Sequence, residues 1–379
     1  MTPAPTAPTY QWYCAGDEIF RDMLTAIDAA TAAICFEIYI FSECPLGERF
    51  REALARASGR GVRVRTLVDA MGSLELSAKF WEPLQQAGGM VKWFNPIALK
   101  QMWIRNHRKL LVCDNEVAFI GGYNVATEYE GDGVTRGWRD MGMKIQGPLV
   151  AQLVISFEEM FARADLRHRY FSRLRKSLAK KTVSQKEGKL LFSGPGRGPN
   201  PIKRALIPDL AKARDVKIIM AYFLPSWQMR RELMRVVRRG GKAQLILAGK
   251  SDVLLSQLAG RSLYRSLMKA GVEIYEYQPQ ILHAKLILID DAVYTGSANL
   301  DPRSLQINYE LMVRFQNPEL VRGAREIFQQ TLEHCEHVEP AAWRKSRTLW
   351  RRVKHRLAYW LLARIDPWVA RWQWRSLPK

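Results

Sequence analysis

The sequence repeats one set of three side chains that could act together on a phosphate. In each copy a histidine and a lysine stand two positions apart, and an aspartate follows the lysine by five. The first copy, "HRKLLVCD", occupies residues 107–114, and the second, "HAKLILID", occupies residues 283–290. Histidine can give or take a proton near neutral pH, and lysine supplies positive charge. The repetition raises the question of which reaction needs two such sets.

The alternation of side chains along a strand divides each copy into two parts. "LLVCD" and "LILID" are apolar, and each precedes a turn and a further apolar run, as in a β-hairpin. The histidine and lysine of each copy then share one face, and the aspartate faces away. We expect Asp114 and Asp290 to be structural and to hold the hairpin turn through Asx-type hydrogen bonds. The pairs expected to act on one ligand are His107 with Lys109 and His283 with Lys285.

A turn of small residues with a nearby asparagine follows each hairpin. Small residues let backbone N–H groups approach an anion closely, and the asparagine adds an amide donor. We expect the two turns to bind one phosphate together. The residues are Gly121, Gly122 and Asn124 in the first copy, and Gly296, Ser297 and Asn299 in the second.

An acidic residue lies downstream of each asparagine. Asp140 in "WRD" and Glu310 in "NYE" each open a run typical of a strand. A nucleophilic histidine needs an acceptor that orients its second ring nitrogen. We assign these two acids as the orienting carboxylates.

A phosphodiester is the substrate class that explains the duplication. Its cleavage needs charge neutralisation, a nucleophile and a protonated leaving group. One histidine can attack phosphorus while the other protonates the leaving oxygen. A single copy could bind phosphate but could not do both.

The rest of the chain repeats in the same order, which predicts the fold. Each half reads strand, helix, strand, a short strand ending in proline, the histidine segment, and an amphipathic helix. This order predicts the α/β class, with two similar α/β domains related by a pseudo-twofold axis, each a mixed sheet flanked by helices. The matched segments are 34–41, 48–61, 62–70, 88–96 and 147–161 in the first half, and 216–224, 230–241, 242–249, 271–279 and 317–332 in the second.

Composition supplies the expected boundaries. We divide the chain into a flexible tail (1–10), a first domain (11–165), a basic, Gly/Pro-rich linker (166–200), a second domain (201–340) and a basic, Trp-rich amphipathic segment (341–379).

The charge and the cysteines narrow the function classes. The net charge of +21 favours an anionic partner, which could be nucleic acid, a membrane surface or a phosphorylated substrate. The five cysteines form no CxxC pair, so a zinc site or disulfide framework is not expected and a reducing compartment fits best. No segment has the pattern of a signal peptide or a membrane-spanning helix, which favours a cytoplasmic protein.

The C-terminal segment is the expected membrane contact. Six of the twelve tryptophans lie in residues 343–379, among many arginines. On a helical projection one face is apolar, as in helices that lie in a membrane interface. The alternative is a helix packed on the protein's own core, and the basic stretch 163–181 is a second candidate surface. The membrane-binding residues predicted here are Trp350, Leu357, Trp360, Leu361 and Trp368.

These features resemble the phospholipase D superfamily, whose signature is HxKxxxxD followed by GG or GS and Asn. Within it the chain is most similar to bacterial cardiolipin synthases of the short form without N-terminal transmembrane helices. The resemblance covers about residues 10 to 335. It is carried by "RNHRKLLVCDNEVAFIGGYNVATEYEG" (105–131), "WRDMGMKIQGP" (138–148) and "HAKLILIDDAVYTGSANLDPRSLQINYEL" (283–311).

The resemblance implies a reaction without metal or cofactor that passes through a phosphohistidine. It implies His107 as nucleophile and His283 as acid. The expected activity is phosphatidyl transfer that forms cardiolipin from phosphatidylglycerol and a second phospholipid. The alternatives are hydrolysis of the headgroup by a phospholipase D, or a nuclease-like phosphodiesterase. The Trp-rich tail favours lipid, so nucleic acid is not the expected partner. We expect peripheral attachment to the inner face of the cell membrane. The sequence sets no oligomeric state.

Overall fold

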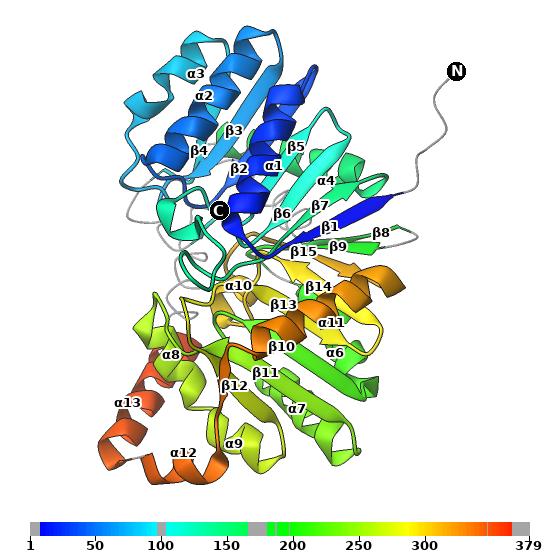
Figure 1. Ribbon diagram of the computed structural model, residues 1–379, viewed down its shortest axis with the longest axis vertical. Helices are drawn as coiled ribbons and strands as arrows, with labels where there is room; N and C mark the ends of the chain where they lie inside the picture. Colours follow the sequence, from blue (N-terminus) through cyan, green and yellow to red (C-terminus); the bar gives the residue numbers. More distant parts are fainter. Residues whose placement is uncertain are drawn as a thin grey trace.

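The protein folds into two α/β halves, each built on one sheet (Figure 1). The structure is a computed structural model. It describes residues 8–96, 104–165, 180–185, 188–196, 198–346 and 348–365.

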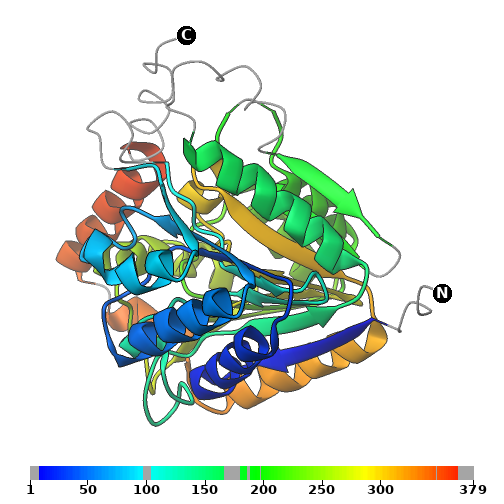
Figure 2. The same cartoon turned by 90° about the horizontal axis from the view of Figure 1, so that it is seen from above.

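The first sheet is mixed and has the strand order β1-β7-β6-β5-β2-β3-β4. Strands β2, β3 and β4 are parallel, and the other neighbours are antiparallel. Helices α1 (Gly16–Ala29) and α2 (Pro45–Gly59) lie side by side on its outer face (Figure 2), together with α3 (Glu82–Gln86). Helix α4 (Leu149–Asp165) covers the inner face. The strands are β1 (Thr9–Tyr13), β2 (Ala33–Ile38), β3 (Arg63–Asp69), β4 (Met90–Phe94), β5 (Leu110–Cys113), β6 (Val117–Gly121) and β7 (Gly142–Gln146).

The second sheet repeats this plan with two more strands, in the order β16-β12-β11-β10-β13-β14-β15-β9-β8. Helices α6 (Pro201–Lys212), α7 (Trp227–Arg238), α8 (Leu254–Arg261) and α9 (Tyr264–Lys269) pack on its outer face. The strands are β8 (Lys181–Ser184), β9 (Gly188–Ser193), β10 (Asp215–Met220), β11 (Lys242–Ala248), β12 (Glu273–Tyr277), β13 (Lys285–Ile289), β14 (Ala292–Gly296), β15 (Glu310–Phe315) and β16 (Cys335–His337).

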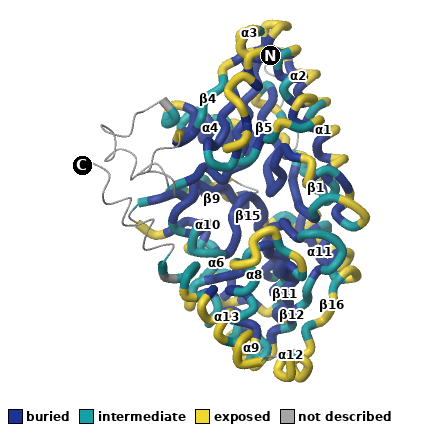
Figure 3. Tube along the Cα trace, turned by 90° about the vertical axis from the view of Figure 1, so that its left-hand side faces the viewer, coloured by how far each residue is buried: buried dark blue, intermediate teal, exposed yellow. Residues whose placement is uncertain are grey.

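The two halves share one hydrophobic core, which confirms the predicted fold class and the packing of similar domains against each other. Leu153 and Phe157 of α4 belong to the same buried cluster as Ile327 and Phe328 of α11 (Pro318–Leu332). The tube in Figure 3 shows the same order, with buried strands inside and exposed helices outside. Burial of apolar side chains from both halves therefore fixes the relation between the two histidine segments.

Two predicted boundaries differ from the structure. Residues 181–184 and 188–193, placed within a linker, form β8 and β9, and β9 pairs antiparallel with β15. The reason is the apolar run Leu190-Leu191-Phe192, which is buried in the core. At the start of the chain, Thr9 and Tyr10 belong to β1 rather than to a loose tail, because they pair with β7.

Asp114 and Asp290 directly follow β5 and β13, and they bond away from the histidines and lysines of their motifs. Their predicted bonding is wrong in one respect, because they bind the chain just before a neighbouring strand rather than their own hairpin turn. The Asp114 carboxylate accepts the amides of Thr31, Ala32 and Ala33 at 2.8–2.9 Å. The Asp290 carboxylate accepts those of Arg214 and Asp215 at 3.0 and 2.8 Å. Both aspartates have left-handed backbone conformations, with φ of 54° and 50°. Each therefore ties its hairpin to β2 or β10.

We expect Asp114→Ala to lower the free energy of unfolding by about 1–3 kcal/mol, because it removes the charged acceptor that three backbone amides share, those of Thr31, Ala32 and Ala33. Burial acts to raise the pKa of Asp114, but the amides of Ala33, Thr31 and Ala32 outweigh it and hold the pKa below its ordinary value. The contribution is therefore complete above the ordinary pKa and is lost as pH falls through the folded value. Chemical unfolding at pH 7 measures the change. The control is Asp291→Ala, an exposed acid beside Asp290. Equal stability of the two variants would contradict the structural role.

Candidate active site

The histidine segment of each half lies against the carboxylate segment of the other half. The backbone N–H of His107 donates to the oxygen of Tyr309 at 3.0 Å, and that of His283 donates to the oxygen of Arg139 at 2.7 Å. Isolated parallel bridges join Asn106 to Tyr309 and Arg139 to Leu282. The chain just before the histidine of each domain therefore runs beside the chain just before the carboxylate of the other domain.

The orienting carboxylates are exchanged between the domains as a result. Nδ1 of His107 lies 3.1 Å from Oε2 of Glu310, and Nδ1 of His283 lies 2.6 Å from Oδ2 of Asp140. Sequence reasoning assigned both acids but not this crossing. Each acid follows the histidine of its own copy along the chain, so nothing local indicates that its partner lies in the other copy.

The two lysines stand behind the histidines. Nζ of Lys109 donates to the backbone oxygen of His107 at 2.9 Å. Nζ of Lys285 donates to the backbone oxygen of His283 and lies 3.1 Å from Nδ1 of that ring. All four side chains are buried, the histidines being 9% and 4% exposed. The two pairs lie close enough for the charge of Lys285 to act on the pKa of both His107 and Lys109, and a ligand shared by the two pairs remains a prediction.

Burial lowers the pKa of each of these four side chains, so the group binds fewer protons than the same residues would in water. Desolvation lowers the pKa of His107 to about 4 and that of Lys109 to about 7, although Glu310 acts to raise both. Burial, with Lys285 adding to it, also lowers the pKa of His283, and burial lowers the pKa of Lys285. Both histidines are consequently neutral at pH 7 in the absence of substrate. A bound phosphate would favour the protonated forms again, since an opposite charge raises the pKa of a base.

The glycine turns position the carboxylates rather than offering amides to an anion. The predicted role is wrong for Gly122 and Ser297, whose N–H groups donate to the oxygens of Met141 and Leu311, each at 2.9 Å. A Cβ on Gly122 would lie 2.1 Å from Oδ1 of Asp140, so only glycine leaves room for that carboxylate. In the second copy the Ser297 hydroxyl donates to Oε2 of Glu310 at 2.5 Å.

Gly121 and Gly296 have φ of 154° and 147° and serve a different purpose. A Cβ at these positions would lie 2.4 Å from the oxygen of Met141 and 2.2 Å from that of Leu311. The missing side chains therefore allow β6 and β14 to approach β7 and β15 closely where the carboxylates begin. The second hairpin has the tighter turn, with two residues between its strands against three in the first.

The two asparagines hold the ends of neighbouring strands. Oδ1 of Asn124 accepts the amide of Ile40 at 3.0 Å, and its Nδ2 donates to the Tyr129 hydroxyl at 2.7 Å. Oδ1 of Asn299 accepts the amide of Tyr222 at 3.4 Å. Each thus contacts a tyrosine whose ring lies near His283, at 5.4 Å for Tyr129 and 6.3 Å for Tyr222, and donation to a phosphate remains a prediction.

Aromatic rings that sequence reasoning missed surround the histidines. The ring of Tyr39 lies 4.7 Å from that of His107, edge to face. Tyr129, Trp138 and Tyr222 lie 5.4, 5.6 and 6.3 Å from the ring of His283. These residues come from three segments far apart in the chain, with Tyr39 after β2, Tyr129 and Trp138 between β6 and β7, and Tyr222 after β10. Together they explain how the imidazoles are kept from water.

A buried network of charged and polar side chains holds the backbone on either side of His107. Nδ2 of Asn106 donates to Oε1 of Glu37 at 2.6 Å, and Arg108 pairs with Oε2 of Glu37 at 3.0 Å. The backbone amide of Asn106 donates to Asp69 at 2.8 Å. These bonds fix the backbone on both sides of His107. Within the described part of the chain, no group of three His, Cys, Asp or Glu residues is placed to hold a metal ion.

Comparison with known proteins assigns the family. The family model described as "Cardiolipin synthase, PLD-like domain" matches residues 23–163 and 206–332, which include every site residue above. The chain belongs to the phospholipase D-like cardiolipin synthase family. Membership makes it a cardiolipin synthase-like phosphatidyltransferase, as the sequence predicted.

Individual relatives agree with this assignment. The chain is 31% identical over 378 residues to cardiolipin synthase 1 of Bacillus cereus, covering 96% of this chain and 73% of the relative. It is 30% identical over 355 residues to cardiolipin synthase B of Salmonella typhi, covering 92% of this chain and 86% of the relative. Among solved structures, phosphatidylserine synthase of Haemophilus influenzae has the same two-domain fold, with a TM-score of 0.75 at 15% identity over 95% of this chain and 94% of that one.

We expect Asp140→Asn and Glu310→Gln each to lower kcat by about 10²- to 10⁴-fold, because each removes the acceptor that fixes one imidazole. Nitrogen NMR of labelled histidine should show a changed tautomer for His283 in the first variant and for His107 in the second. Asp114→Ala is the control that should keep its activity. A tautomer change in the histidine of the same half would contradict the exchange.

We expect kcat/KM for an anionic substrate to fall as pH rises above about 7. Lys109 is protonated below its lowered pKa of about 7 and loses its charge above it. A profile from pH 6 to 9 measures the fall. Lys109→Arg, which stays charged throughout, should be slower but should lack this alkaline limb. A flat wild-type profile would contradict a charge role for Lys109.

Proposed function

We propose that the protein forms cardiolipin by moving a phosphatidyl group from phosphatidylglycerol to the headgroup hydroxyl of a second phospholipid. The reaction passes through a phosphatidyl-histidine. The observation that carries the proposal is the pair of imidazoles whose Nδ1 atoms are each held by a carboxylate, at 3.1 and 2.6 Å, beside two buried lysines. Cardiolipin as the product is supported by the names of the relatives.

In the first step, Nε2 of His107 attacks phosphorus and the bond from phosphorus to the headgroup glycerol oxygen breaks. His283 gives a proton to that oxygen, and glycerol leaves. In the second step, His283 takes the proton of the acceptor hydroxyl, whose oxygen attacks phosphorus, and the bond between nitrogen and phosphorus breaks. Lys109, Lys285, Asn124 and Asn299 stabilise the charge on the phosphoryl oxygens in both steps. The enzyme ends in its starting state.

The division of roles follows the resemblance to the phospholipase D superfamily, which implies His107 as the nucleophile and His283 as the acid, and the surroundings of the two rings are compatible with it. The nucleophile must be neutral, and the pKa of His107 is about 4 as a result of burial. The acid must be protonated after substrate binds. His283 has the closer carboxylate, and Asp252 also acts to raise its pKa. A phosphodiester anion beside His283 raises its pKa further and so favours the protonated form that the acid step needs.

We also propose that the protein works at the surface of a membrane, with the C-terminal segment in contact with lipid and the site on the cytoplasmic side. Trp350, Leu357 and Trp360 are exposed on α13 (Leu349–Trp360), which supports this contact. Leu361 is half-buried, and Trp368 lies outside the described residues. In the described ranges, no helix combines the length and the apolar character needed to cross a bilayer.

A substrate with a good leaving group distinguishes the roles of the two histidines, because its departure needs no acid. With phosphatidylglycerol, we expect His107→Ala and His283→Ala each to lose about 10²- to 10⁴-fold or more in cardiolipin formation. With phosphatidyl-p-nitrophenol, whose leaving group departs without a proton, His283→Ala should keep a burst of nitrophenol and accumulate the lipid-labelled enzyme. His107→Ala should show neither.

The outcomes are distinct. The reverse pattern would exchange the two roles, and a burst without a covalent adduct would reject the phosphohistidine. The product measured in vesicles of phosphatidylglycerol decides between transfer and hydrolysis, because phosphatidic acid in place of cardiolipin would identify a phospholipase D. Cleavage of DNA without turnover of lipid would promote the nuclease alternative.

A further inference from the structure

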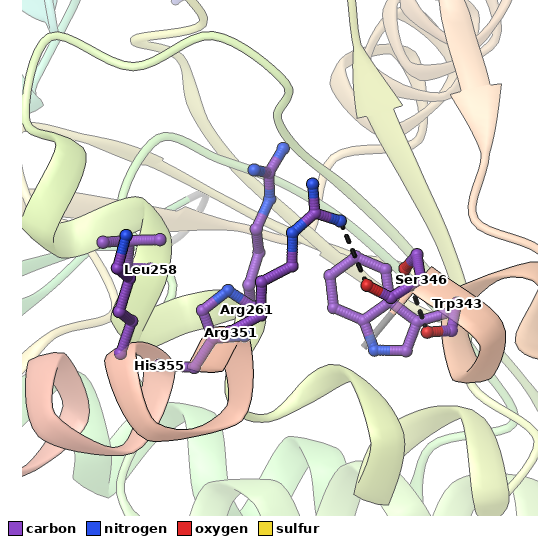
Figure 4. A pocket seen from close by; sticks show the side chains of 7 residues that line it. Leu258, Arg261, Trp343, Ser346, Arg351 and His355 are labelled. Carbon is purple, nitrogen blue, oxygen red and sulfur yellow. Dashed lines mark hydrogen bonds between the residues drawn. The ribbon is translucent and has the colours of Figure 1, made fainter. Parts of the chain in front are cut away.

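A cavity away from the catalytic histidines lies between α8, α12 (Pro340–Ser346) and α13. Its volume is about 250 Å³. Figure 4 shows Arg261 of α8 and Arg351 of α13 on one side of it and the indole of Trp343 on the other. The lining residues are Leu258, Arg261, Trp343, Ser346, Arg351, Lys354 and His355.

Among the described residues that line the cavity, several are cationic and none is acidic. Arg261 already meets a carboxylate, since both its Nε and its Nη2 lie 2.9 Å from Glu276. Within the described part of the chain, Arg351 forms no ion pair, and its Nη1 donates to the neutral backbone oxygen of Ser346 at 3.1 Å. Nζ of Lys354 lies 5.4 Å from the ring centroid of Trp350. Arg351 and Lys354 therefore give the cavity a net positive charge that suits an anion.

The outward face of α13 beside Lys354 is apolar, since the ring of Trp350 lies 5.4 Å from Nζ of Lys354, and this narrows the kind of anion. Helix α13 buries Ala358 and His355 against the protein and turns its opposite side outward. There Leu349, Trp350 and Leu357 are 76%, 66% and 54% exposed. An anion site next to exposed tryptophan and leucine matches a phospholipid, whose phosphate and acyl chains are adjacent.

We propose that this cavity binds the phosphate headgroup of an anionic phospholipid in the bilayer, as a docking site separate from the catalytic one. The occupant is a lipid of the membrane surface, held at its phosphate by Arg351 and Lys354 and at its chains by the exposed face of α13. The proposal does not depend on which lipid the catalytic site transfers.

Helix α8 connects this site to the catalytic one. It begins just after Asp252, whose carboxylate accepts the hydroxyl of Tyr222 at 2.5 Å, and the ring of Tyr222 lies 6.3 Å from that of His283. It ends at Arg261 in the cavity. Eight residues of helix span about 12 Å. The exposed Val253 and Leu254 lie at its catalytic end. A bilayer docked at the cavity would therefore also meet the chain that leads to His283.

Vesicle sedimentation tests the docking site. We expect the full-length variant Arg351→Ala/Lys354→Ala to bind phosphatidylglycerol vesicles about 10- to 30-fold more weakly than wild type at physiological salt. Binding to phosphatidylcholine vesicles should change little. The matched control is Arg63→Ala/Lys79→Ala, which removes the same charge from exposed positions of the first half. It should lose less than about threefold. Equal losses in the two double variants would overturn the site.

A second variant separates the cavity from general surface charge. Ser346→Phe narrows the cavity and leaves every charge in place, so it should weaken binding as the double variant does. Unchanged binding in Ser346→Phe would reduce the effect to diffuse attraction and overturn the site. Activity on a short-chain, dispersed substrate should stay within about twofold in all variants, which shows that they fold and that the catalytic group is intact.

The source of the phosphate is tested with two soluble probes. Dihexanoyl phosphatidylglycerol, below its micellar concentration, should raise the Tm of the wild type clearly more than that of the double variant, which keeps the catalytic site alone; an equal rise in both proteins would overturn the docking site. Inorganic phosphate at matched ionic strength should do so much more weakly. A shift with inorganic phosphate alone would make this a site for the free ion and reject the lipid.

Discussion

The hydrogen bonds between each histidine and a carboxylate of the other domain are the interaction on which the site depends. A nucleophilic imidazole needs its second nitrogen fixed, and here neither half contains the acceptor for its own histidine. His107 relies on Glu310, and His283 relies on Asp140. The shared core, the close approach of β6 to β7 and of β14 to β15, and the glycine beside Asp140 all serve to keep these contacts in place.

Burial gives the site its chemical character. Four basic side chains are crowded together and desolvated, so the empty site holds fewer protons than the same residues would in water. An anion is the missing partner, and its arrival restores the charge that catalysis needs. The aromatic rings around the imidazoles strengthen this dependence by excluding water. Selectivity for a phosphodiester is therefore partly electrostatic, because a neutral ligand would leave the lysines and histidines without compensation.

The sequence predicted the features that recur in both halves, and it missed the contacts that join segments far apart in the chain. Both histidine segments, the paired acids and the duplicated α/β order follow from spacing and periodicity, which are local properties. The partners of Asp140 and Glu310, the walls formed by Tyr39 and Trp138, and the bonds of Asp114 to residues 31–33 join segments far apart in the chain. The turn at Gly122 was misread because a small residue leaves room for anything nearby, and only the fold shows that the neighbour is a carboxylate. Strands β8 and β9 were not predicted, because the residues around them are polar and glycine-rich.

The exchange of carboxylates also constrains how such a chain could arise. A single ancestral half carrying one histidine, one lysine and one acid has all the residue types but cannot orient its own imidazole. Two copies related by a twofold axis supply each other's acceptor, so a homodimer of halves would have been complete before the gene was duplicated. Fusion of two such halves would release the copies from identity, and Gly122 opposite Ser297 is one place where the two halves differ. This divergence is limited, because a change in the acid of one half alters the orientation of the histidine in the other half.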